Sequence, residues 1–171
     1  MKLILKRRLW ATSLLLASFA GSATEQAYQM VVIAEDPLAA LISADSIDPA
    51  AVAQAPALPA DRFARQMNLC VLYSKQQRWS EANTACHQAV TAGRDSKLQG
   101  SASPRELRSY AYNNRGVAKS LTGDHLGALA DFQRADVLAD HAVISHNLAK
   151  LTARINQPWV AAMRTSVAAP K

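Results

Sequence analysis

An internal repeat constrains the fold of this chain more than any other feature of its sequence. In each copy an Asn is followed by an Ala after 14 residues, by a large or apolar residue after 18, and by a second Ala after 21. The first copy has Asn68, Ala82, Cys86 and Ala89, and the second has Asn114, Ala128, Phe132 and Ala135. Small and large residues at these intervals are typical of two helices joined by a turn. One such pair cannot bury its apolar face alone, so we expect stacked pairs and an all-α fold.

Local signals indicate where these helices begin and end. Ser103-Pro104-Arg105-Glu106 has the form of a capping box with Pro at the first helical position. Gly123 suits the left-handed residue that ends a helix, and Asp124 can cap the next one. We expect Asp61 and Asp140 to cap the helices that follow them.

The repeat resembles the tetratricopeptide repeat (TPR), a 34-residue helix pair with small, aromatic and glycine residues at fixed positions. The residues that carry the resemblance are Cys70, Tyr73, Gln77, Trp79, Ala82, Cys86 and Ala89 in the first copy, and Gly116, Lys119, Gly123, His125, Ala128, Phe132 and Ala135 in the second. The sequence departs from the family pattern at Gln77, which replaces the turn glycine, at Lys119, which replaces an aromatic residue, and at Cys86, which replaces a large ring.

The resemblance implies a short TPR-like α-solenoid over residues 61–156, made of two helix pairs and a closing helix. The closing helix is expected at Asn147-Leu148-Ala149, which lies 33 residues after Asn114. The two copies lie 46 residues apart rather than 34, so we infer an insertion of 12 residues between Ala92 and Ser103.

The resemblance also implies a concave face lined by the first helix of each pair, which is the usual binding surface of the family. The residues expected to bind a protein or peptide partner there are Met67, Asn68, Val71, Tyr110, Asn113, Asn114, Val117, His146, Asn147 and Lys150. Side-chain amides suit an extended peptide because they can serve both its N–H and its C=O groups. In the alternative interpretation, the Asn side chains make local hydrogen bonds and the chain's own linker fills the groove.

Cys70 and Cys86 are the only two cysteines. The TPR register sets them opposite each other in the first helix pair, where they either form a disulfide or fill the core as buried thiols. A disulfide over so short a loop would contribute about 3 kcal/mol.

The N-terminus has the form of a signal peptide over residues 1–23. Lys2, Lys6, Arg7 and Arg8 precede a short apolar run, and small residues follow. These four cations account for much of the formal charge of +6. We therefore expect cleavage near Ala23 and a periplasmic or secreted product, which meets the membrane only during export.

Residues 24–60 are rich in Ala and Pro, and we expect most of them to form a flexible linker. One stretch, Tyr28 to Ala34, is apolar and β-prone. It is expected either to pack against the folded domain or to dock onto a partner. A flexible C-terminal tail is expected over residues 157–171.

The sequence favours a non-catalytic interaction module or scaffold of the bacterial cell envelope, with a protein or peptide partner and without a cofactor. His141 and His146 are five residues apart, which does not suit a helical metal pair, and no phosphate loop or nucleophile elbow occurs. Nucleic acid is not an expected partner of an exported chain. The alternative function is a redox or enzyme-associated accessory protein that uses Cys70 and Cys86.

Overall fold

The computed structural model describes residues 27–43, 49–54, 62–94 and 102–167. These residues contain helices and no strand, which confirms the all-α prediction for the described part of the chain. The helices are α1 (Leu38–Ser43), α2 (Pro49–Gln54), α3 (Arg62–Lys75), α4 (Trp79–Ala92), α5 (Pro104–Leu121), α6 (His125–Leu138) and α7 (Ala142–Val167).

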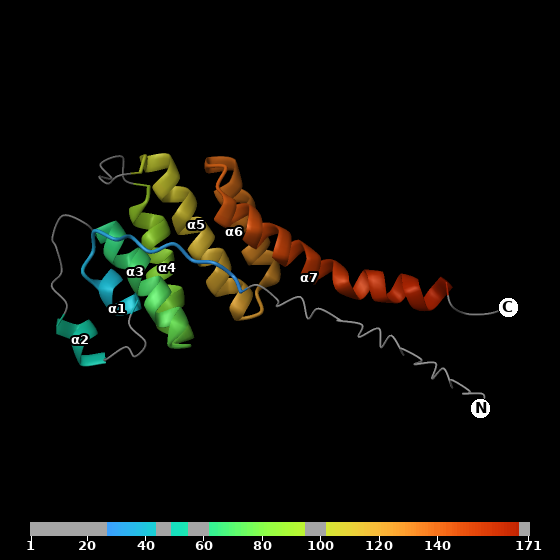
Figure 1. Ribbon diagram of the computed structural model, residues 1–171, viewed down its shortest axis with the longest axis horizontal. Coiled ribbons are helices and arrows are strands. Elements are labelled where there is room, and N and C mark those ends of the chain that lie inside the picture. Colours follow the sequence, from blue (N-terminus) through green and yellow to red (C-terminus); the bar gives the residue numbers. More distant parts are fainter. Residues whose placement is uncertain (1–26, 44–48, 55–61, 95–101, 168–171) are drawn as a thin grey trace, which may run out of the picture.

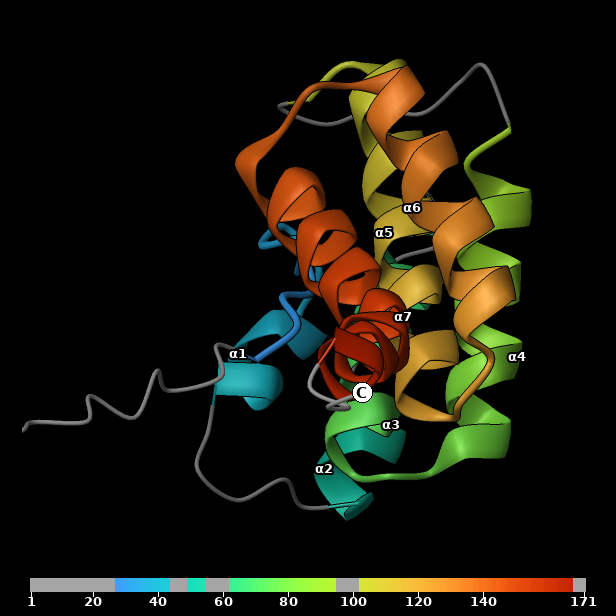
Figure 2. The ribbon, with the colours of Figure 1, turned by 90° about the vertical axis from the view of Figure 1, so that its right-hand side faces the viewer.

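The five longer helices form a curved array of two layers (Figures 1 and 2). Helices α3 and α4 form one hairpin, α5 and α6 form a second, and α7 packs on α6. Helix α5 also contacts α3 and α7, so these three lie side by side in one layer. Helices α4 and α6 form the other layer (Figure 2).

The residues of the sequence repeat form the contact surface within each hairpin. Ala82 and Ala89 of α4 and Ala128 and Ala135 of α6 are at most 1 % exposed. Small side chains at these points let the paired helices approach closely, because a larger residue would force the backbones apart. The 14- and 21-residue intervals therefore mark helix contacts in both copies.

Most of the predicted helix ends are confirmed. The Ser103 hydroxyl accepts a hydrogen bond from the Glu106 N–H at 3.2 Å, and Pro104 is the first residue of α5. Gly123 has φ 89°, and the Asp124 carboxylate accepts from the Gly127 N–H at 2.9 Å. The predicted cap at Asp61 lies outside the described residues.

The predicted cap at Asp140 is wrong. Helix α7 begins at Ala142, and the Nδ1 atom of His141 accepts from the Val143 N–H at 3.3 Å. The imidazole nitrogen occupies the place expected for a carboxylate oxygen, because the chain enters the helix one residue later than the sequence suggested.

The prediction of a flexible linker over residues 24–60 also needs correction where the structure describes these residues. Residues 27–33 are extended along the array, and α1 follows them directly. Leu38 and Ile42 are 0 % and 5 % exposed and pack with Val71 and Leu72 of α3. These apolar contacts and a 2.6 Å hydrogen bond from the Lys75 ammonium to the Ile42 C=O hold α1 on this surface, although such a short helix has little stability of its own.

The expected C-terminal tail is shorter than predicted. Helix α7 continues past Pro158 to Val167 rather than ending near residue 157. A proline inside a helix removes one N–H donor and crowds the carbonyl four residues earlier, and here that carbonyl belongs to the exposed Arg154, where water can bind it.

Candidate peptide-binding groove

Residues 27–33 cross the layer formed by α3, α5 and α7, and we call this stretch the groove segment (Figure 1). The first residues of the segment contact α7, and its last residues contact α3. The segment lies on the side of the array opposite α4 and α6 (Figure 2), and we use the word groove for the surface of α3, α5 and α7 that it covers.

Three buried asparagines, one from each helix, hold the backbone of the groove segment. Each Asn accepts a hydrogen bond from the N–H of one residue and donates to the C=O of the same residue. The pairs, with the accepted and donated bonds in that order, are Asn147 with Gln29 (2.9 and 2.7 Å), Asn114 with Val31 (2.8 and 2.7 Å) and Asn68 with Ile33 (2.8 and 2.8 Å).

This arrangement, which we call the asparagine ladder, follows from the geometry of an extended chain. The N–H and C=O groups of alternate residues point to the same side, so residues 29, 31 and 33 face the helices together. An amide side chain is both donor and acceptor, so one Asn can replace one residue of a neighbouring strand. All three Asn side chains are fully buried, and each unmade bond there would cost about 1–3 kcal/mol.

Two further polar residues support the ladder. The Asn113 amide donates to the Gln29 C=O at 3.1 Å, and its oxygen accepts from the Asn147 amide at 2.8 Å. At the other end, the buried Asp36 carboxylate accepts from the Asn68 amide at 3.3 Å and from the Leu38 N–H at 2.9 Å. Asp36 thereby links the ladder to the start of α1.

Sequence reasoning did not single out Asp36. Its signal was present in Asp36-Pro37-Leu38, because an Asp followed by Pro is a common start of a helix.

The side chains of the groove segment use both of its faces. Val31 and Ile33 pack against the buried cluster that contains Phe63, Met67 and Tyr110. The even-numbered residues pack on the other side: Met30 and Val32 against the cluster of Val71 and Leu72, and Tyr28 and Met30 against that of Val117 and Leu151. The segment is therefore half-buried between two apolar surfaces.

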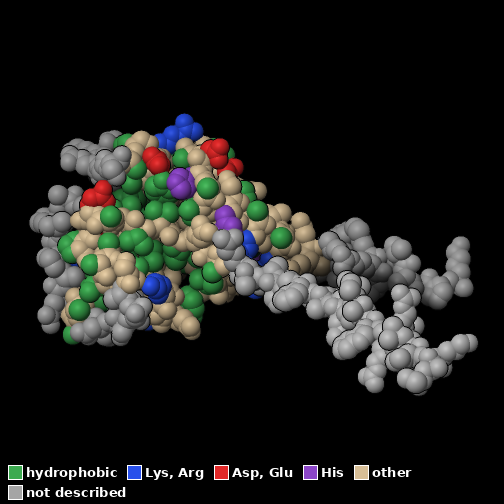
Figure 3. Space-filling view, viewed as in Figure 1, with side chains coloured by type: hydrophobic (Ala, Val, Ile, Leu, Met, Phe, Trp, Pro, Cys, Tyr) green, Lys and Arg blue, Asp and Glu red, His purple; other side chains and the backbone are tan. Residues whose placement is uncertain are grey.

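The side chains of His146 and Lys150 lie at the α7 end of the groove. His146 Nε2 lies 3.3 Å from the Ala27 carbonyl oxygen, and the Lys150 ammonium lies 5.2 Å from the centre of the Tyr28 ring. On the groove face, uncharged side chains occupy most of the centre and charged ones gather towards the edges (Figure 3). The groove is thus suited to an extended, mostly apolar segment.

All ten residues predicted for the concave face line this groove. Their functional role as partner-binding residues remains a prediction, because the segment that they surround belongs to the same chain. The structure agrees with one part of the alternative interpretation, because the chain's own residues 27–33 fill the groove, but the Asn side chains bond residues 35 to 118 positions away rather than making local hydrogen bonds.

Tyr110 has an altered acidity within this lining. Burial and a 2.7 Å hydrogen bond from its hydroxyl to the Glu106 carboxylate raise the pKa of Tyr110 to about 12. The hydroxyl therefore stays protonated, and keeps donating to Glu106, up to a higher pH than a free tyrosine would. This bond fixes the ring that packs in the cluster of Val31 and Ile33.

Cys70 and Cys86 form a disulfide between α3 and α4, and both residues are fully buried. Of the two interpretations of the sequence, disulfide or buried thiols, the structure contains the disulfide.

The described residues contain no group of three His, Cys, Asp or Glu side chains that could hold a metal ion. None of the helices in the described ranges has the length and hydropathy needed to cross a bilayer.

The comparisons with known proteins give no match to a family model, to a curated protein or to a solved structure. The function must therefore be argued from the groove itself.

Proposed function

We propose that this chain is a non-catalytic protein-interaction module of the bacterial cell envelope, in which a short TPR-like solenoid binds an extended peptide along α3, α5 and α7. The asparagine ladder is the observation that carries this proposal. It contacts backbone atoms, which every peptide has, so it selects for an extended conformation rather than for one sequence. The apolar walls then select for the side chains.

The helix arrangement supports the TPR-like assignment. Two hairpins carry the same residue intervals, a further helix closes the array, and the ladder uses the corresponding Asn of α3, α5 and α7. Stacked helix pairs that present their first helices on one face form an extended binding surface.

The groove segment acts as a resident occupant in this proposal. Because it is tethered to the same chain, it competes with any partner at a high effective concentration. A partner segment must therefore bind more tightly than residues 27–33 or arrive when these residues are displaced. Loss of the groove segment should strengthen partner binding.

Location in the envelope is supported by two features. The N-terminal sequence has the charge and hydropathy pattern of an export signal, although it lies outside the described residues. The Cys70–Cys86 disulfide is compatible with an oxidising compartment. Its complete burial gives no support to the redox alternative, because thiol–disulfide exchange needs access to a sulfur atom.

The test uses the full chain and a labelled synthetic peptide with the sequence of residues 27–34. Val31→Pro removes the backbone N–H that donates a hydrogen bond to Asn114 Oδ1, so it should loosen the groove segment without shortening the chain. By fluorescence anisotropy, the peptide should bind the Val31→Pro protein more tightly than the wild-type protein.

A second substitution in the Val31→Pro background tests the ladder itself. Asn114→Ala should weaken peptide binding by about 1–3 kcal/mol, because two backbone groups of the bound peptide lose their partner. Asn83→Ala, on the exposed side of α4, is the matched control and should leave binding unchanged. Equal affinity of the Asn114→Ala and Asn83→Ala proteins would show that the groove does not read the peptide backbone.

A further inference from the structure

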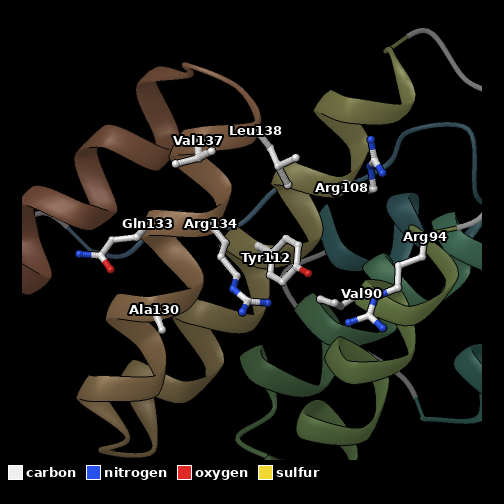
Figure 4. Close-up of a pocket in the computed structure, with 9 residues that line it drawn as sticks. All are labelled: Val90, Arg94, Arg108, Tyr112, Ala130, Gln133, Arg134, Val137 and Leu138. Atoms are coloured by element: carbon white, nitrogen blue, oxygen red, sulfur yellow. The ribbon is translucent and has the colours of Figure 1, made fainter.

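A second concave site lies away from the groove, where α4, α5 and α6 meet (Figure 4). It is a pocket of about 500 Å³, which is within the usual size range of small-molecule sites. Its walls include the apolar side chains of Val90 from α4 and Leu138 from α6. The Tyr112 ring of α5 lies between α4 and α6 (Figure 4).

Three arginines line this pocket, and none of the nine lining residues is acidic. Arg94 follows the end of α4, Arg108 belongs to α5, and Arg134 belongs to α6. The described residues provide no carboxylate within ion-pair distance of any of the three. The pocket therefore has a positive potential that its own lining does not neutralise.

The acidic residue in the neighbouring part of the α5–α6 interface is already engaged. Asp131 accepts hydrogen bonds from the Arg115 guanidinium at 2.6 and 2.8 Å and lies 2.9 Å from the Lys119 ammonium. Both carboxylate oxygens are therefore occupied by cations other than the pocket arginines. Asp131 is only 2 % exposed and cannot turn towards the pocket without breaking these bonds.

Tyr112 lies at the centre of the positive charge. Burial acts to raise the pKa of Tyr112, but hydrogen bonding to Arg134 and Arg94 outweighs it and lowers the pKa below the usual value. The Arg134 guanidinium carbon is also 5.9 Å from the centre of the Tyr112 ring. Arg134 thus lies near the Tyr112 ring, and both Arg94 and Arg134 interact with its hydroxyl.

We propose that this pocket binds a small organic anion, namely a carboxylate, sulfonate or phosphate ester attached to a flat apolar group. The guanidinium groups of Arg94 and Arg134 bind the acidic oxygens, since planar guanidinium forks match such groups. The apolar group packs against Tyr112, Val90 and Leu138. This site is independent of the asparagine ladder, so it can be occupied with or without a peptide in the groove.

The probe for this site is 2-naphthoate, which combines an aromatic body with one carboxylate. Titration into the full-length protein, followed by calorimetry or by ligand-observed NMR, should give saturable binding that weakens as the salt concentration rises. Two analogues of the same shape, neutral 2-naphthalenemethanol and cationic 2-naphthylmethylamine, should bind at least about 10-fold more weakly, because they lack the charge that the arginines recognise.

Substitution of the arginines locates the binding. Arg134→Gln should weaken 2-naphthoate binding roughly 10-fold or more, because it removes a charge-assisted hydrogen bond. Arg154→Gln, on the exposed surface of α7, removes one positive charge as Arg134→Gln does, but it should leave binding unchanged. Both residues are exposed, so both variants should fold as the wild type does.

Three results would overturn the proposal. The first is the absence of saturable binding below about 10 mM 2-naphthoate. The second is equal binding of the neutral analogue, which would indicate only apolar adsorption. The third is an equal loss of affinity in the Arg134→Gln and Arg154→Gln proteins, which would indicate a general charge effect. Because the Asn114→Ala variant leaves these arginines in place, failure of the groove proposal has no effect on this outcome.

Discussion

The two hairpins of this chain share residue intervals but use different chemistry at the same positions. In α3–α4, Cys70 and Cys86 are joined by a disulfide. The corresponding residues of α5–α6, 46 positions later, are Gly116 and Phe132. A Cβ atom on Gly116 would lie 2.7 Å from the Phe132 ring, so the missing side chain makes room for the ring.

A second set of matched positions differs in charge. Arg115, Lys119 and Asp131 form an ion cluster between α5 and α6. The first hairpin has Leu69, Tyr73 and Ala85 at the corresponding positions, and these pack in the apolar cluster around the disulfide. The repeat therefore requires a close helix contact at fixed intervals, whereas the interaction that provides this contact differs between the hairpins.

The largest effect is expected at Phe132. Phe132→Ala should lower the free energy of unfolding by about 3–5 kcal/mol, because it removes a fully buried ring opposite Gly116 and leaves a cavity. The change also removes the ring that lies 6.2 Å from the Tyr28 ring, centre to centre. Chemical denaturation measures the loss, and Leu126→Ala, at a residue of the same helix that is 79 % exposed, should change stability by less than about 0.5 kcal/mol. Similar losses in the two variants would contradict the proposed contact.

The ion cluster provides the second test. Asp131→Ala should cost about 3 kcal/mol, because it leaves the Arg115 and Lys119 cations, 15 % and 27 % exposed, without their carboxylate. Replacing the whole cluster by the residues of the first hairpin, Arg115→Leu with Lys119→Tyr and Asp131→Ala, should recover most of this loss. Denaturation of both variants gives the comparison, and a triple variant less stable than Asp131→Ala would mean that the two interfaces are not interchangeable.

Removal of the disulfide tests the first hairpin in the same way. Cys70→Ala with Cys86→Ala should lower the free energy of unfolding by about 3 kcal/mol, as expected for a closed loop of this length, with a sequence separation of 16. Adding a reductant should destabilise the wild-type protein by a similar amount and leave the double variant unaffected. Unchanged stability of the wild-type protein in reductant at equilibrium would argue against a contribution from this bond.

The smallest effect is expected at the turns between the paired helices. Gln77 and Gly123 occupy the same place in the two copies, and both have a positive φ, 58° and 89°. Gln77→Gly should stabilise the protein by up to about 1 kcal/mol, since glycine adopts this conformation without steric cost. Gly123→Ala should destabilise it by about 1 kcal/mol or more, for the opposite reason. Thermal melts of both variants would contradict the comparison if the two changes had the same sign.

The asparagine ladder could be predicted from the sequence only in part. The resemblance to the TPR implied that Asn68, Asn114 and Asn147 share one face. It left open whether their amides serve a partner or the chain's own linker. That choice depends on contacts between residues up to 118 positions apart, as for Gln29 and Asn147, and no local pattern encodes such a separation.

The Arg94–Arg108–Arg134 pocket was not predicted from the sequence. These residues come from three different elements, and only the packing of α4, α5 and α6 brings them together. On α5 itself, Arg108 and Arg115 belong to one basic helix. The structure separates their roles, because Arg115 pairs with Asp131 while Arg108 lines the pocket.

The helix pairs, their contact residues and most of their ends can be read from the amino-acid sequence, because these depend on interactions between residues close in the chain. Helical period and caps act within one or two turns, and the small-residue spacing spans a single helix hairpin, so all three can be read from a short stretch of sequence. By contrast, three features become visible only in the folded chain: residues 27–33 occupy the groove, α1 packs on α3, and three arginines surround one pocket. These features depend on burial and on hydrogen bonds between distant segments, whose free energy exists only once the helices have stacked.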